Sequence, residues 1–229
     1  MTKEYIVDTP PIRAWSLSRL EQAETCPYRI FLKVVMRIEE PSNEYLERGI
    51  KVHKTIEKFI KGESDSLEGV KCHNNYYKLL HKLYKQGKVL VEENWGFTKD
   101  WAPTDWFSDD VFHRSKLDYV LNIGDGRIEV GDHKTGRPHE VRNMSQAALY
   151  AIDAFVHYPD ATEIIVKFLY VDSGKTKEIK YKHNQAEIYR KNFEARGNRL
   201  VNMTEFPPRP GWACKRCNFK NHCQYSEAE

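Results

Sequence analysis

The sequence lacks long apolar stretches, and their absence excludes several classes of protein. No run approaches the roughly 20 apolar residues that span a bilayer, and residues 1–5 contain no apolar core of a signal peptide. Internal repeats and low-complexity segments are also missing. We therefore expect an intracellular, cytoplasmic protein. Structural disulfides are rare in that compartment, so grouped cysteines there indicate metal binding.

The sequence also has little net charge. Lysine and arginine number 36 against 33 acidic residues, which gives a formal charge of +3 over 229 residues, too little to indicate nucleic-acid binding by itself. Hydrophobic residues make up 40% and charged residues 30% of the chain, as in globular proteins with a large solvated surface. A chain of this length buries a sizeable core without disulfides. We predict a single domain over residues 1–229, with its core at about 44–202.

Two predicted strands carry the most informative residues. Residues 114–123 contain Asp118, and residues 127–134 end in the acid-x-lysine triplet that runs from Asp132 to Lys134. The segment 124–126, Gly-Asp-Gly, is predicted to join them as a three-residue hairpin loop whose last glycine is left-handed.

This loop length fixes the predicted register of the two strands. Closing on three residues places Ile123 opposite Arg127 and, further along the ladder, Asp118 opposite Asp132. Directly opposed residues share one face, with Cβ atoms roughly 5 Å apart. Alternation then puts Lys134 on the same face and turns the His133 side chain away.

Two carboxylates and a lysine on one face indicate metal-dependent cleavage of a phosphodiester. Carboxylates bind Mg²⁺ or Mn²⁺, which activates water, and a lysine stabilises charge on the phosphate. Residues 44–61 are predicted to form a helix whose apolar stripe offers a third ligand, His53. That stripe comprises Leu46, Ile50, His53, Ile56 and Ile60. Further candidate ligands are the backbone carbonyl of His133 and the carboxylate of Glu92 or Glu93.

Other polar and aromatic residues are candidates for contact with a nucleic acid. Gln146 and Tyr150 are spaced i, i+4 on a helix predicted at 143–157, so both side chains can reach a phosphate or a water from one face. Four tryptophans are candidates for base stacking, although core packing is the preferred interpretation for at least two of them. They are Trp15, Trp95, Trp101 and Trp106.

Three of the five cysteines are grouped near the C-terminal end. Cys214, Cys217 and Cys223 follow a C-x2-C-x5-C spacing, and Cys26 is the predicted fourth ligand, which leaves Cys72 as a free thiol. Four thiolates suit zinc or an iron–sulfur cluster, and the spacing does not decide between them. If Cys26 joins, residues 16–38 and 207–223 form the cluster-binding parts of the domain.

Together these residues resemble the PD-(D/E)XK nuclease superfamily. The closer resemblance is to RecB-like exonucleases with an iron–sulfur staple, such as the AddB nuclease domain and the CRISPR-associated RecB-like exonucleases. It implies a restriction-endonuclease-like α/β fold with a mixed central sheet flanked by helices. It also implies the following roles: metal ligation by His53, Asp118, Asp132 and the His133 carbonyl, catalysis by Asp118, Asp132 and Lys134, DNA contact by Gln146 and Tyr150, and a 4Fe-4S cluster on Cys26, Cys214, Cys217 and Cys223.

The expected activity is therefore hydrolysis of DNA from its ends, with a preference for single strands, in replication, recombination or repair. A nuclease that trims prespacers in CRISPR adaptation is an alternative with the same fold. A non-catalytic module that binds DNA ends is an alternative of another class, and the intact acid-x-lysine set argues against it.

Overall fold

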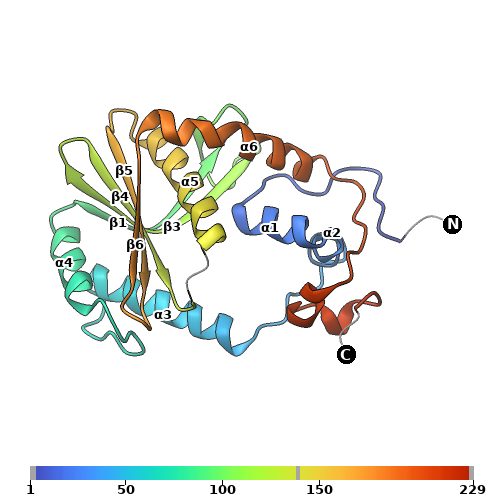
Figure 1. The fold of residues 1–229 in the computed structure, drawn as a ribbon, viewed down its shortest axis with the longest axis horizontal. Coiled ribbons are helices and arrows are strands. Elements are labelled where there is room, and N and C mark those ends of the chain that lie inside the picture. The colour runs from blue at the N-terminus through green and yellow to red at the C-terminus, as the bar shows by residue number, and fades with distance from the viewer. Residues whose placement is uncertain (1–3, 138–139, 227–229) are drawn as a thin grey trace.

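A six-stranded mixed sheet lies at the centre of the protein, seen in a computed structural model that describes residues 4–137 and 140–226 (Figure 1). The strands are β1 (Val89–Phe97), β2 (Pro103–Thr104), β3 (His113–Gly124), β4 (Arg127–Lys134), β5 (Glu163–Tyr170) and β6 (Thr176–Tyr181). Their order is β2-β1-β3-β4-β5-β6. Only β4 and β5 pair in parallel, and this confirms the predicted α/β fold with a mixed central sheet.

Helices cover both faces of the sheet (Figure 1). One face carries α3 (Glu44–Lys61) and α4 (Asn74–Tyr84), and the other carries α5 (Glu140–His157) and α6 (His183–Val201). Each face has its own apolar core, which is expected because a sheet covered on both sides buries both sets of side chains. No helix among the described residues is both long and apolar enough to cross a bilayer.

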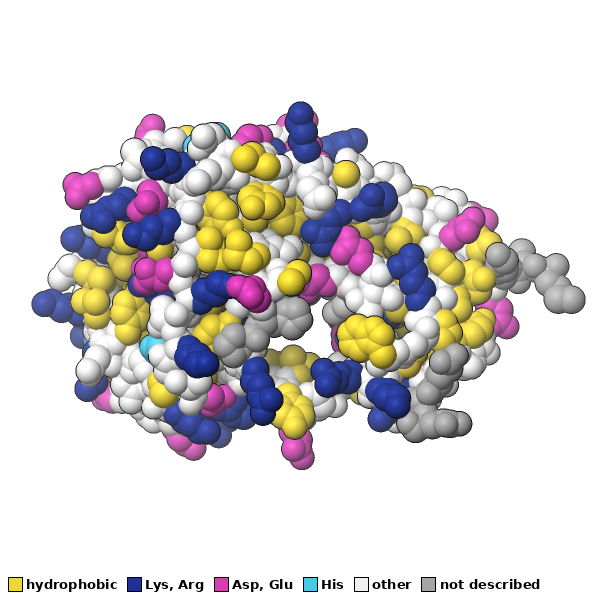
Figure 2. All heavy atoms as spheres, viewed as in Figure 1, with side chains coloured by type: hydrophobic (Ala, Val, Ile, Leu, Met, Phe, Trp, Pro, Cys, Tyr) yellow, Lys and Arg dark blue, Asp and Glu magenta, His cyan; other side chains and the backbone are white. Residues whose placement is uncertain are grey.

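Smaller helices from the two ends of the chain lie together, away from the sheet (Figure 1). These are α1 (Leu17–Thr25), α2 (Pro27–Ile30), the π-helix η1 (Phe31–Val35) and the 3₁₀ helices η2 (Trp212–Arg216) and η3 (Lys220–His222). Arg209 Nη1 donates to the Glu24 carbonyl at 2.7 Å, and Arg196 forms an ion pair with the Glu24 carboxylate at 2.7 Å. In the space-filling view a hollow separates this part from the sheet and α3, with lysine and arginine side chains around it (Figure 2).

Helix α3 has the predicted bounds, but only part of its apolar stripe is buried. Asn43 caps its start by accepting a hydrogen bond from the Leu46 amide at 3.0 Å. Ile56 and Ile60 are fully buried as expected. Leu46 and Ile50, however, are 45% and 63% exposed, so the N-terminal part of the predicted apolar stripe is not buried. It borders an open cavity beside the sheet instead.

The turn between β3 and β4 also differs from the prediction. Gly124 pairs with Arg127, so the loop has two residues, Asp125 and Gly126, rather than three. Both have positive φ, 53° and 71°, as the favoured two-residue hairpin turns require. The predicted pairing of Ile123 with Arg127 is therefore wrong.

A bulge in β3 nevertheless restores the predicted register beyond the turn. The pairing shifts between Asn122 and Gly124, which leaves Ile123 as the extra residue. From there the ladder runs in the predicted register to its last pair, Tyr119 with Gly131. Asp118 and Asp132 are the next residue on each strand, so the shorter loop and the bulge compensate for each other.

Gly131 allows an aromatic side chain to lie directly across β4. A Cβ atom built on Gly131 would stand 1.8 Å from two ring atoms of Tyr119, far inside van der Waals contact. The Tyr119 hydroxyl donates to Glu129 at 2.8 Å, and its ring stacks on the His133 ring with 5.6 Å between centroids. Tyr119 and Gly131 are the sequence neighbours of Asp118 and Asp132, so this packing holds β3 and β4 together next to the two aspartates.

Candidate active site

One group of metal-binding side chains converges beside the end of the β3–β4 ladder. Ligand atoms of His53, Glu92 and Asp118 all lie within 4.8 Å of one another, and this is the one such group among the described residues. His53 Nδ1 lies 3.1 Å from Asp118 Oδ1, and the His133 backbone N–H donates to Asp118 Oδ2 at 2.6 Å. An imidazole and two carboxylates are donors that suit Mn²⁺ or Mg²⁺, so the residues present fit such an ion.

Glu92 enters this group because of the β1–β3 pairing. Its neighbours pair as Val91 with Tyr119 and Glu93 with Leu117, so Glu92 lies across from Asp118. Its φ is 58°, a left-handed conformation that is uncommon for a residue other than glycine and is found at functional sites. Glu93, the alternative raised by the sequence, instead accepts a hydrogen bond from Trp95 Nε1 at 3.4 Å.

Asp132 belongs to a second network that faces α5. Lys134 Nζ lies 2.7 Å from Asp132 Oδ2 and also donates to Gln146 Oε1 at 2.7 Å. Gln146 Nε2 donates to Asp132 Oδ1 at 2.8 Å and to the Tyr150 hydroxyl at 2.8 Å. The Tyr150 hydroxyl lies 2.9 Å from the Lys116 carbonyl and 3.3 Å from Asp132 Oδ1. The predicted i, i+4 pair therefore fixes the acid and the lysine in place.

The two networks meet in one cavity. Its lining includes His53, Glu92, Asp118, Asp132 and Tyr150. The side chain of His133 is buried outside it, between Tyr77 and Tyr119, as strand alternation predicted. The exposed residues Leu46 and Ile50 of α3 border the same cavity.

Charge pairing within the site separates the pKa values of the two aspartates. Burial would lower the pKa of His53, but the hydrogen bond and charge of Asp118 outweigh it and raise the pKa to about 9. Burial would likewise raise the pKa of Asp118, but His53 lowers it to about 2. Burial raises the pKa of Asp132 above its ordinary value, Lys134 opposes this rise, and Asp118 adds to it. A cation entering the site must therefore compete with the proton on His53.

The predicted cysteine ligands lie around one cavity without forming a close group among the described residues. Cys26, Cys214, Cys217 and Cys223 line one small cavity between α2 and the C-terminal 3₁₀ helices, whereas Cys72 does not line it. None of the five forms a disulfide. Arg209 closes one side, with its backbone N–H 3.4 Å from Cys26 Sγ.

Three of the four tryptophans belong to the core. Trp15, Trp95 and Trp101 are at most 5% exposed, so they are not available for base stacking. Trp106 is partly exposed and borders a separate cavity beside Lys134.

The mixed sheet thus presents two acids to one cavity and a lysine beside the second acid, an arrangement that suits a nuclease. Residues 14–115 and 112–224 match the family model described as the PD-(D/E)XK nuclease superfamily. The chain belongs to this superfamily and is a nuclease.

Solved structures agree with this fold. The crystal structure of SSO0001 is similar with a TM-score of 0.50 and 16% identity, covering 93% of this chain and 87% of that one. A protein from Eubacterium rectale described as "Putative exonuclease" is similar with a TM-score of 0.52 and 14% identity, covering 93% and 88%. At these identities the likeness concerns the fold alone. No curated protein matches the chain significantly.

Proposed function

We propose that this protein is a RecB-like, metal-dependent exonuclease that hydrolyses DNA from its ends and prefers single strands. One observation carries the proposal: Asp118 and Asp132 line one cavity with His53, and Lys134 lies 2.7 Å from Asp132 in a neighbouring cavity that Asp132 and His53 also line. These are the residue types that cleavage of a phosphodiester requires. The similar structure described as an exonuclease supports attack at ends.

His53, Glu92 and Asp118 would hold Mg²⁺ or Mn²⁺, and the resemblance adds Asp132 and the His133 carbonyl to this set. The bound ion would activate a water and polarise the scissile phosphate. Lys134 orients the attacking water and stabilises the negative charge that develops on the phosphate. Gln146 and Tyr150 hold Asp132 through hydrogen bonds of 2.8 and 3.3 Å, so that carboxylate keeps one orientation as the substrate enters.

The cysteine cavity would hold a 4Fe-4S cluster rather than zinc. Tetrahedral zinc with bonds of about 2.3 Å would bring its thiolates within ~4 Å of one another. Among the described residues no three cysteine sulfurs come within 4.8 Å of one another, although four cysteines line the cavity. The resemblance to RecB-like exonucleases favours the 4Fe-4S cluster. The cluster would then join residues 16–38 to residues 207–223 around the core at 44–202, as one domain.

Digestion of end-labelled DNA in Mn²⁺ tests the activity. The wild-type protein should degrade linear single strands, leave circular single strands intact and act more slowly on duplexes. Asp132→Ala and Lys134→Ala should each lower the rate by ~100-fold or more, the scale of losing a group that stabilises the transition state. Glu163→Gln, at the start of β5, is a matched control and should keep the wild-type rate. Wild-type rates in both site variants would refute the assignment, and digestion of circular strands would refute an exonuclease.

A further inference from the structure

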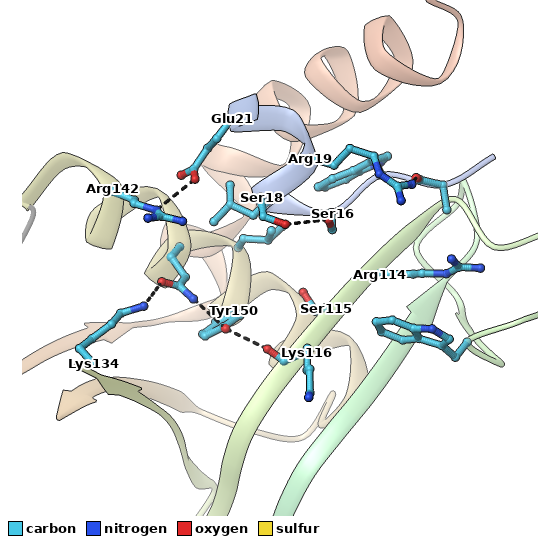
Figure 3. A pocket seen from close by; sticks show the side chains of 16 residues that line it. Ser16, Ser18, Arg19, Glu21, Arg114, Ser115, Lys116, Lys134, Arg142 and Tyr150 are labelled. Carbon is cyan, nitrogen blue, oxygen red and sulfur yellow. Dashed lines mark hydrogen bonds and ion pairs between the residues drawn. The ribbon is translucent and has the colours of Figure 1, made fainter. Parts of the chain in front are cut away.

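A second cavity adjoins the candidate site on the side of α1. It has a volume of about 380 Å³, within the ~300–1,000 Å³ of pockets for small ligands. Lys134 and Tyr150 border one end, where Gln146 hydrogen-bonds to both, while Arg19 and Arg114 lie at the other (Figure 3). The pocket is therefore open to the catalytic groups and is of nucleotide size.

Positive charge dominates the lining of this cavity. Its cations are Arg19, Arg114, Lys116, Lys134 and Arg142, and its one acid is Glu21. Three of these cations have acidic partners: Lys116 with Glu92 at 2.8 Å, Lys134 with Asp132 at 2.7 Å, and Arg142 with Glu21 at 3.0 Å. Among residues 4–137 and 140–226, no carboxylate lies within ion-pair distance of Arg19 or Arg114.

Two like charges held close together in a half-buried pocket favour an anion between them. Arg19 donates to the Ala14 carbonyl at 2.6 Å, which fixes its guanidinium at this end of the cavity. Burial and the charge of Arg114 lower the pKa of Arg19 below its ordinary value, which reflects the repulsion between the two groups. Arg114 Nε is buried, and no atom of the described part of the chain accepts a hydrogen bond from it. Guanidinium groups bind phosphate oxygens through paired hydrogen bonds. A phosphate would therefore reduce the repulsion between the two guanidinium groups and accept a hydrogen bond from Arg114 Nε.

Trp106 gives the pocket an aromatic surface next to these charges. Its ring centroid lies 5.4 Å from the Arg114 guanidinium carbon. Trp15 also lines the cavity but is fully buried, whereas Trp106 is partly exposed there. Aromatic side chains beside basic groups are the elements that bind single-stranded nucleic acids, because they stack on bases that duplexes keep paired.

We propose that this pocket binds one nucleotide of a single strand, with its phosphate on Arg19 and Arg114 and its base on Trp106. This inference rests on the proposed function, because it places the nucleotide on the same strand that the site cleaves. Lys116 and Tyr150 line both cavities, so the strand passes between them from the pocket to Asp118. A duplex must open before one of its strands can enter a pocket of this size.

Fluorescence anisotropy of a short labelled oligothymidine, measured in EDTA so that it is not cut, tests the proposal. Trp106→Ala should weaken binding by about 5- to 150-fold, the range for loss of one base–aromatic stack, and Trp106→Phe should restore most of it. Arg114→Gln and Arg19→Gln should each lower the slope of log K against log salt by ~0.7, as for one lost phosphate contact on a single strand. Arg127→Gln removes the same charge at the far hairpin and should leave binding unchanged.

The same assay shows whether the pocket binds a terminal or an internal phosphate of the strand. If a terminal phosphate improves wild-type binding and Arg114→Gln abolishes the gain, the pocket holds a strand end. If phosphorylated and hydroxyl ends bind equally and Arg114→Gln still weakens both, it holds an internal phosphate. Binding by the Arg114 and Trp106 variants at the level of Arg127→Gln would overturn the proposal, provided that circular dichroism shows them folded.

Hydrolysis of bis(p-nitrophenyl) phosphate in Mn²⁺ separates this proposal from the proposed function. Hydrolysis of this small diester by the wild-type protein reports on the catalytic groups without a bound strand, and Arg127→Gln should hydrolyse it at the wild-type rate. A wild-type protein that fails to hydrolyse the diester and to digest DNA would refute the proposed function. The anisotropy series would still decide whether the pocket binds a strand.

Discussion

Replacing Gly131 by alanine tests how the two strands of the candidate site are held. Propensity alone predicts that alanine in a strand is more stable than glycine by about 0.5–1 kcal/mol. The structure predicts the opposite sign, because the new Cβ would stand 1.8 Å from the Tyr119 ring. Tyr119 is fully buried and cannot move into open space.

The size of the effect follows from what Tyr119 contacts. Overfilling a packed core costs about 1–3 kcal/mol. A shift of the ring would also break its hydrogen bond to buried Glu129, which costs roughly 1–3 kcal/mol more. We therefore expect Gly131→Ala to lower the free energy of unfolding by about 4 kcal/mol, a large part of the ~5–15 kcal/mol typical of a domain.

Urea unfolding, monitored by circular dichroism, measures this loss in the free energy of unfolding. A double-mutant cycle identifies its cause. In a Tyr119→Leu background the ring is absent, so the cost of Gly131→Ala should fall below about 1 kcal/mol. Gly49→Ala on α3 is the matched control, because its Cβ meets only Thr135 Oγ1 at 3.6 Å. It should stabilise the protein by up to ~1 kcal/mol. A gain in stability from Gly131→Ala, or an equal cost in both backgrounds, would refute the reasoning.

Three further predictions concern the metal site, pH and the cysteine cavity. Glu92→Gln should weaken Mn²⁺ binding at least ~10-fold in calorimetry while Glu93→Gln leaves it unchanged, and equal affinities would remove Glu92 from the ligand set. Burial lowers the pKa of His133 to about 4, below its unfolded value of 6.5, so the unfolded chain binds the proton more readily. The contribution of neutral His133 to the free energy of unfolding should be fully present above pH 6.5 and be lost as the pH falls toward 4. Over that range the wild type should lose about 3 kcal/mol more than His133→Phe, and parallel curves for the two proteins would contradict this. Cys26→Ser should remove visible cluster absorption whereas Cys72→Ser should not, and a colourless wild-type protein containing zinc would exclude the cluster.

Much of the candidate site could be predicted because its signals are local. The acid-x-lysine triplet lies on one strand, so alternation alone puts Asp132 and Lys134 on one face. The i, i+4 spacing of Gln146 and Tyr150 likewise puts both on one side of a helix, where they now contact Asp132. The position of Asp118 was also predicted, but from a three-residue loop where the protein has two residues and a bulge at Ile123. The register was right only because these two errors cancel.

The sequence by itself thus determined the hairpin strands, the helices at 44–61 and 143–157 and the residues of the acid-x-lysine strand, since periodicity and spacing are properties of neighbouring residues. The superfamily followed from the resemblance that these residues carry. Tertiary structure alone decided that Glu92 faces Asp118, that Leu46 and Ile50 border a cavity, and that Arg19 and Arg114 line one pocket with no acidic partner among the residues that the structure describes. Each of these depends on which strand pairs with which, or on where a helix runs past the edge of a core. Such contacts join residues far apart in the chain, and no local pattern specifies them.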